Sequence, residues 1–137
     1  MIYLVEDDSS IRELVIYALN STGLEAKGFE KPSEFWKAVE EEEPSLVILD
    51  VMLPEESGID VLKKIRSNPA IEKLPVIMET AKTSEYDRIN GLESGADDYI
   101  SKPFSMMEMV ARVKALIRRS EYKHEEKDYT INNLYVC

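Results

Sequence analysis

Cysteine, basic residues and long apolar runs are all scarce in this sequence of 137 residues. The single cysteine, Cys137, excludes a disulfide within the chain, which is the usual situation in a reducing cytosol. Lysine and arginine number 17 against 27 acidic residues, and a net charge of −10 repels nucleic acid, so any DNA contact must come from another segment. No apolar run approaches the ~20 residues of a membrane span. We therefore expect a cytoplasmic location and no membrane partner.

The chain does contain short apolar runs that end in acidic residues. Residues 46–49 are all apolar and are followed by Asp50, and residues 2–5 are followed by the acidic residues 6–8. Uninterrupted runs of this length are typical of strands buried on both faces of a parallel sheet. Ligands of open α/β sheets bind beyond the carboxyl ends of such strands. If the two strands are neighbours, their carboxylates meet at one edge of the sheet.

Strand and helix patterns alternate along residues 1–119, which predicts an α/β, doubly wound five-stranded parallel sheet with five helices. The predicted strands span residues 2–5, 24–29, 46–50, 74–79 and 98–100. Ser9 or Ser10 is the expected N-cap of the first helix, with Asp8 as the alternative. The fourth helix, near residues 84–94, has a thin apolar face and is expected to pack loosely.

The pattern changes at Ser120. Residues 120–128 are polar and charged, as linkers are, and residues 129–137 read as two short strands around a turn at Asn132 and Asn133. We therefore expect one domain over residues 1–119, a linker, and the start of a truncated further domain.

The acidic edge predicts a particular chemistry. Glu6, Asp7 and Asp50, brought together, repel one another and raise one another's pKa. Mg²⁺ relieves this repulsion, binds one or two carboxylates and leaves positions for phosphate oxygens. An aspartate can also attack phosphorus and form an aspartyl phosphate, which needs a cation and a hydroxyl donor beside it. Lys102 and Thr80, each at the end of a predicted strand on the same edge, are the candidates for these two roles.

Residues 1–119 resemble the receiver domain of two-component response regulators. The resemblance is carried by residues 5–8, 49–54 with Gly58, 75–78 with Thr80 and Ala81, 91–99, and 102–104. Residues 91–99 and 111–119 are similar to the OmpR/PhoB-type subfamily, whose receiver is followed by a winged-helix DNA-binding domain. Residues 129–137 are similar to the start of that domain. The resemblance implies the flavodoxin-like receiver fold with strand order 2-1-3-4-5.

The resemblance also implies a phosphoacceptor and a set of metal ligands. Asp50 would accept a phosphoryl group from a sensor histidine kinase. Asp7 would bind Mg²⁺ (or Mn²⁺) directly, Glu6 through water, and the Met52 carbonyl would be a further ligand. The domain would be no enzyme beyond catalysing its own phosphorylation and dephosphorylation.

Lys102, Thr80 and Tyr99 complete the set implied by the resemblance. Lys102, joined to Pro103 by a cis bond, would pair with Asp50 and then with the phosphoryl group. Thr80 would donate a hydrogen bond to a phosphoryl oxygen, and Tyr99 would move inward behind it.

Phosphorylation in OmpR/PhoB-like regulators implies a homodimer, formed through the fourth helix, fifth strand and fifth helix. The charged residues of this expected dimer face are Arg88, Glu93, Asp97, Asp98, Glu108, Arg112 and Lys114. Mixed charges suit a twofold interface, in which acid meets base across the axis. Dimerisation would control DNA binding and transcription by the C-terminal domain.

Glu79 departs from the family pattern, in which the residue before Thr80 is apolar. Strand alternation points its side chain away from Thr80 and toward the helices. Because an unpaired buried carboxylate costs several kcal/mol or stays protonated, we expect Glu79 to reach solvent or a cation such as Lys82. Otherwise the fourth strand is distorted.

Two other functions are compatible with parts of the pattern. A phosphatase of the haloacid-dehalogenase type also forms an aspartyl phosphate, but it needs a second acid where this chain has Met52. The other alternative is a single-domain receiver that signals by binding a protein partner without DNA.

Overall fold

Five parallel strands form a single sheet in the order β2-β1-β3-β4-β5. The structure, a computed structural model, describes residues 1–81, 89 and 94–136, and of residues 122–136 it describes the backbone. The strands are β1 (Ile2–Val5), β2 (Ala26–Phe29), β3 (Leu46–Asp50), β4 (Val76–Ala81) and β5 (Asp98–Lys102). The predicted doubly wound sheet and its strand order are confirmed.

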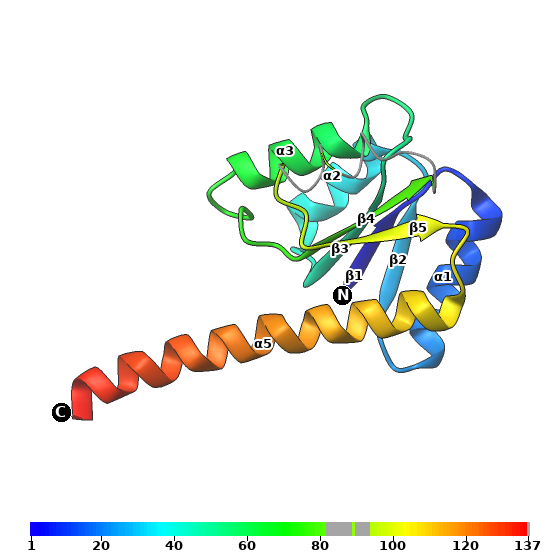
Figure 1. The fold of residues 1–137 in the computed structure, drawn as a ribbon. Helices are drawn as coiled ribbons and strands as arrows, with labels where there is room; N and C mark the ends of the chain where they lie inside the picture. The colour runs from blue at the N-terminus through cyan, green and yellow to red at the C-terminus, as the bar shows by residue number, and fades with distance from the viewer. Residues whose placement is uncertain (82–88, 90–93, 137) are drawn as a thin grey trace.

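Helices cover both faces of this sheet. Within the described residues they are α1 (Ser9–Ser21), α2 (Pro32–Glu41), α3 (Gly58–Ser67) and α5 (Met106–Val136). Helices α1 and α5 lie on one face, and α2 and α3 lie on the other (Figure 1). The predicted fourth helix falls almost entirely outside the described residues. None of the helices in the described part of the chain has the length and apolar character of a membrane span.

Strand β3 contributes side chains to the hydrophobic cores on both faces of the sheet. All five of its residues are buried. Val47 and Leu49 pack with α2 and α3 on one face, whereas Ile48 packs with α1 and α5 on the other. Each fully buried aliphatic side chain of this kind stabilises the fold by about 1.5–3 kcal/mol. The strand that carries Asp50 is therefore among the most firmly held parts of the molecule.

The end of α5 differs from the prediction for residues 120–137. The backbone is helical through Val136, where a linker and two strands were expected, and the helix runs past the edge of the sheet (Figure 1). The strand prediction is therefore wrong for residues 129–136. Two short strands need a sheet to pair with, whereas a helix forms its backbone hydrogen bonds within itself. The division into a receiver and a further domain stays a prediction.

Candidate metal and phosphoacceptor site

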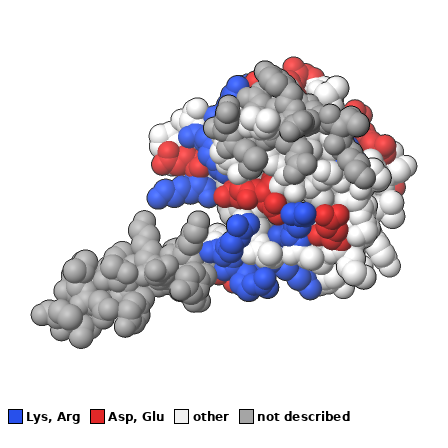
Figure 2. Space-filling model, in the orientation of Figure 1, with Lys and Arg blue, Asp and Glu red and all other residues white. Residues whose placement is uncertain are grey.

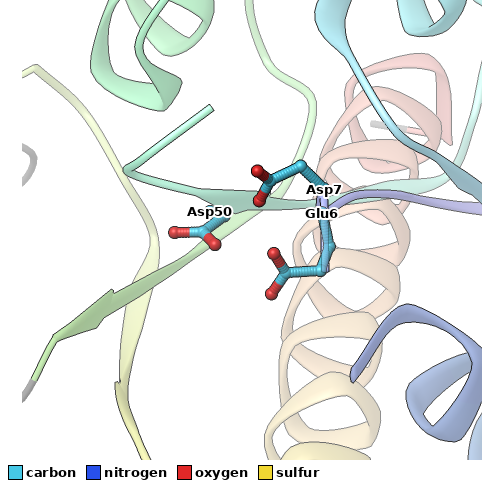
Figure 3. Close-up of side chains that lie close together, drawn as sticks. All are labelled: Glu6, Asp7 and Asp50. Atoms are coloured by element: carbon cyan, nitrogen blue, oxygen red, sulfur yellow. The ribbon is translucent and has the colours of Figure 1, made fainter. Parts of the chain in front are cut away.

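Three carboxylates meet at the carboxyl ends of two neighbouring strands. Glu6 and Asp7 follow β1, and Asp50 ends β3, which pairs with β1. Ligand oxygens of the three residues lie within 4.8 Å of one another, and Figure 3 shows the carboxylates facing a common space. Glu6 and Asp50 are buried, whereas Asp7 is exposed to solvent. A set of carboxylate oxygens, open to water on one side, fits a hard divalent cation.

Asp8 does not belong to this cluster, because it caps α1. Its Oδ1 accepts hydrogen bonds from the backbone N–H groups of Ser10 (2.9 Å) and Ile11 (3.2 Å). The prediction of Ser9 or Ser10 as the cap was wrong, and the alternative was correct. An aspartate reaches two of the free N–H groups of the first turn from this position. Two of the three consecutive acids therefore remain for the metal.

Lys102 places an ammonium group against the buried carboxylates. Its Nζ donates to Asp50 Oδ2 at 2.6 Å and to Glu6 Oε1 at 2.8 Å. The Lys102–Pro103 peptide bond is cis, as the resemblance implied. Burial by itself lowers the pKa of Lys102, but the hydrogen bonds to Asp50 and Glu6 outweigh burial and raise it above the ordinary value. Burial and the hydrogen bond with Asp50 raise the pKa of Glu6, and the hydrogen bond from Lys102 opposes this rise.

Glu79 also belongs to this site, although its side chain was expected to point toward solvent or Lys82. It neighbours Asp50 across the β3–β4 ladder, its side chain is 0% exposed, and its Oε2 lies 3.9 Å from Lys102 Nζ. Within the described part of the chain, neither of its oxygens has a hydrogen-bond partner. The expectation that Glu79 reaches solvent was therefore wrong, and Lys82 lies outside the described residues.

The backbone around Glu79 stays regular. Strand β4 keeps its register with both neighbours, and the Glu79 carbonyl accepts a hydrogen bond from the Val51 N–H at 2.9 Å. Burial and the nearby Glu6 raise the pKa of Glu79 well above its usual range. The register explains the placement, because residues at matching positions of adjacent strands point to the same face. Aligning the ends of the third and fourth predicted strands is the signal that finds Glu79.

Thr80 and Tyr99 lie on the other face of the same sheet edge. Thr80 follows Glu79 on β4 and is 1% exposed, and its hydroxyl has no hydrogen-bond partner among the described residues. Tyr99, on the neighbouring β5, is buried in the core that α2 and α3 cover. Thr80 sits on β4, which pairs with the Asp50 strand, and Tyr99 sits on β5, one strand further out. Their movement on phosphorylation stays a prediction.

The loop after β3 carries the remaining candidate ligand. The Met52 N–H donates to Asp50 Oδ1 at 3.0 Å, which holds the start of the loop against the carboxylate. The Met52 side chain is 74% exposed and offers no polar group. The resemblance assigns the metal-ligand role to its carbonyl, and the loop brings this residue to the acidic edge.

The expected dimer face is only partly described. Arg88 and Glu93 lie outside the described residues. Arg112 pairs within the chain with Asp98 (3.1 Å) and Glu108 (3.1 Å), and Lys114 is exposed.

Asp97, the remaining member, contacts α3 and β4 rather than α5. Its Oδ2 lies 2.9 Å from Arg66 of α3 and accepts the Val76 N–H at 2.8 Å. Figure 2 shows acidic and basic side chains mixed on the face that displays β5 and α5. Asp97, Asp98, Glu108 and Arg112 thus form pairs within one molecule, and the use of this face in a dimer stays a prediction.

The fold and the acidic edge together define a receiver domain, and comparison with known proteins agrees. The chain belongs to the family described as the response regulator receiver domain, whose model matches residues 2–114. Among its curated relatives, the transcriptional regulatory protein GltR of Pseudomonas aeruginosa is 48% identical over 88% of this chain and 50% of that protein. The alkaline phosphatase synthesis transcriptional regulatory protein PhoP of Bacillus subtilis is 46% identical over 88% and 49%, respectively.

Solved structures show the same fold. A putative response regulator from Chloroflexus aurantiacus has a TM-score of 0.81 at 32% identity, covering 85% of this chain and 96% of that one. NtrX from Brucella abortus, solved in complex with ADP, has a TM-score of 0.86 at 27% identity, covering 93% and 29%. The chain spans about half the length of the curated relatives it matches. The chain is thus a response regulator receiver domain, related to the receivers of OmpR/PhoB-type transcriptional regulators.

Proposed function

We propose that this receiver is switched by phosphorylation of Asp50, with Mg²⁺ (or Mn²⁺) bound and a sensor histidine kinase as the donor. The observation that carries the proposal is the position of the Asp50 carboxylate, which forms an acidic cluster with Glu6 and Asp7 and accepts a hydrogen bond from the Lys102 ammonium. An aspartate that belongs to a metal site and is paired with a fixed cation is suited to accept a phosphoryl group. The domain is no enzyme in its own right and acts in the cytoplasm.

Glu6, Asp7, Asp50 and the Met52 carbonyl would hold the metal. When bound, the cation offsets the charge of the carboxylates and of the phosphoryl oxygens. An Asp50 oxygen attacks phosphorus, the phosphorus–nitrogen bond of the kinase phosphohistidine breaks, and its electron pair returns to the ring nitrogen. Lys102 turns from the carboxylate to the phosphoryl group.

Thr80 and Tyr99 relay the change to the surface. The Thr80 hydroxyl, which has no partner among the described residues, donates to a phosphoryl oxygen. Tyr99 then fills the space behind it, and the two-state domain shifts toward its active form.

An apolar hollow beside Lys102 supports direct contact with a protein donor. It is lined by Ile11 and Leu14 of α1, by Ala81 of β4, and by residues 102–104 and 106. Leu14 is 56% exposed, although it is a large aliphatic side chain. Lys102 lines this hollow and also pairs with Asp50, so a kinase that presents a phosphohistidine to Asp50 can cover the hollow as well.

The active form would dimerise through its fourth helix, β5 and α5, and so control DNA binding by a C-terminal domain. Support for this part comes from the relatives, which are transcriptional regulators by name and of which the chain matches about half. The chain itself carries a net charge of −10, so the DNA contact belongs to that further domain.

The test is incubation with acetyl phosphate and Mg²⁺, followed by intact mass. We expect the addition of one phosphoryl group, which Asp50→Asn and chelation by EDTA both abolish. Asp60→Asn, which changes an exposed aspartate of α3, serves as the matched control and keeps the addition. Absence of any addition to the unmodified chain would overturn the proposal.

A further inference from the structure

The loop between Asp50 and α3, residues 51–57, is held firmly at both ends. The Gly58 N–H donates to the Val51 carbonyl at 2.9 Å, and Ser57 Oγ accepts the Asp60 N–H at 3.1 Å. A Cβ atom at Gly58 would lie 2.0 Å from the Asp50 carbonyl oxygen, so only glycine allows this close approach. These contacts place the ends of the loop. Its middle, which faces α2, is held by different groups.

Glu55 fixes the middle of the loop to the start of α2. Its Oε1 accepts the Ser33 N–H at 2.9 Å, and its Oε2 accepts the Ser33 hydroxyl at 3.0 Å. Lys31, the N-cap of α2, makes no side-chain cap hydrogen bond in the described structure. A carboxylate 22 positions away in the sequence therefore satisfies an N–H group of the first turn. The backbone hydrogen bond from Ser33 holds the pKa of Glu55 below its usual value, so the group stays ionised.

The backbone of Glu55 adopts an unfavourable conformation, which the contact with Ser33 helps to hold. Glu55 has φ of 70°, and it is the only non-glycine residue with positive φ in the described chain. Side chains with a Cβ rarely adopt this conformation, and it persists only where surrounding contacts hold it.

Glu56 adds a second attachment to the same face of α2. Its Oε1 accepts the Trp36 Nε1–H at 3.1 Å, and its Oε2 pairs with Lys64 of α3. Ser33 and Trp36 are three residues apart, so they lie on one side of the helix. Two consecutive carboxylates thus attach the loop to successive turns of α2, a few residues from Met52.

We propose that Glu55 and Glu56 are positioning residues, which fix residues 51–57 to α2 so that the Met52 carbonyl is held at the metal site. This inference rests on the proposed function of the acidic edge. Removing the attachment weakens metal binding, because a loop that moves must be ordered again each time the ion binds. By linkage, a bound metal also protects the start of α2 from opening.

The test compares Mg²⁺ affinity, by isothermal titration calorimetry, between the unmodified chain and Glu55→Asn. Asparagine tolerates positive φ, but its side chain is too short to reach Ser33. We expect the Mg²⁺ dissociation constant to rise on the order of threefold to tenfold, at or below the effect of outer partners of metal ligands. Glu40→Gln removes the same charge from an exposed position of α2 and leaves the constant unchanged. Equal constants for Glu55→Asn and Glu40→Gln would overturn the inference.

Amide hydrogen exchange gives a second readout that does not depend on phosphorylation. In the unmodified chain, Mg²⁺ slows exchange of the Ser33 amide, whereas in Glu55→Asn the amide exchanges faster and Mg²⁺ no longer protects it. If Glu55→Asn fails to fold, Ser33→Ala with Trp36→Phe removes the two side-chain donors of α2, leaves the N–H of residue 33 bonded to Glu55, and is expected to weaken Mg²⁺ binding by a smaller factor. Strong Mg²⁺ binding by these variants would sink the inference and leave the proposed function intact. Absence of Mg²⁺ binding by the unmodified chain would overturn both.

Discussion

Replacing Glu79 tests the electrostatics of the acidic edge most directly. Glu79 is fully buried beside Glu6 and Asp50, and Lys102, whose ammonium the described residues place among them, already donates to the other two carboxylates at 2.8 and 2.6 Å. Its distance to Glu79 is 3.9 Å, too long for a hydrogen bond. Among the described residues, these three carboxylates and one ammonium leave an excess of negative charge in a buried place. Glu79 is thus poorly compensated in the absence of a metal ion.

Glu79→Val is therefore expected to stabilise the metal-free protein. Valine suits a buried position of β4, and replacing poorly compensated buried charge with an apolar side chain stabilises proteins by about 1–4 kcal/mol. We expect a gain of about 2 kcal/mol in the free energy of unfolding at pH 8, because valine is smaller than glutamate and leaves some space unfilled.

The pH dependence of this gain follows from the raised pKa of Glu79. Between the ordinary glutamate pKa of 4.5 and the higher value in the fold, the native state binds more protons than the unfolded state. The unmodified chain therefore loses stability as the pH rises through that window. The advantage of Glu79→Val is smallest near pH 5 and grows toward pH 8. Glu79→Gln, which has no titrating group, reduces the same pH dependence while keeping the size of the side chain.

The measurement is urea unfolding in EDTA at several pH values, followed by the fluorescence of Trp36, the only tryptophan. EDTA removes divalent cations, which would otherwise compensate the carboxylates. If Glu79→Val is less stable than the unmodified chain at pH 8, or if its gain does not change with pH, the reasoning about buried charge is wrong.

Three further substitutions test neighbouring parts of the site. Lys102→Met removes the cation from the buried carboxylates. The substitution should lower the free energy of unfolding by about 2 kcal/mol at pH 8, less than for a fully buried pair because Lys102 is one quarter exposed. Mg²⁺ should restore part of this loss of stability. Equal stability of the variant with and without Mg²⁺ would count against this. Met52→Asn supplies a polar group that can orient water, so phosphorylated Asp50 should decay faster in a mass-spectrometric time course, and an unchanged lifetime would contradict the idea. Arg112→Glu places an acid beside Asp98 and Glu108 and should reduce dimerisation of the phosphorylated protein in light scattering; an undiminished dimer would show that this face is not the interface.

Local sequence pattern was sufficient to predict the sheet and most of the acidic edge. Strand β3 is recognisable because four apolar residues precede Asp50, and the same pattern places Glu6 and Asp7 after β1. Carboxyl ends of parallel strands share one edge, so these acids meet once β1 and β3 are neighbours, an order that the resemblance to receiver domains implied. Lys102 was found in the same way, at the end of β5.

Contacts between distant segments could not be predicted in this way. The sequence identified Glu79 as unusual, but its position beside Asp50 and Lys102 emerges only when the ends of β3 and β4 are aligned, and the hydrophobic pattern of each strand does not specify that register. The attachment of Glu55 to Ser33 joins the loop after β3 to the first turn of α2, and no periodicity marks it. The failed strand prediction for residues 129–136 has a related cause, because strands require partners whereas a helix does not.

By itself, the sequence determined the five strands of the sheet and the first three helices, and that acids and a lysine end the strands of this receiver. Hydrophobic periodicity encodes this information, because it depends only on residues a few positions apart. Tertiary structure alone decided how the charges are shared. In the folded chain, Lys102 donates hydrogen bonds to Glu6 and Asp50 rather than to Glu79, and Arg66 pairs with Asp97. Such pairing depends on distances of a few ångströms between segments that packing alone brings together.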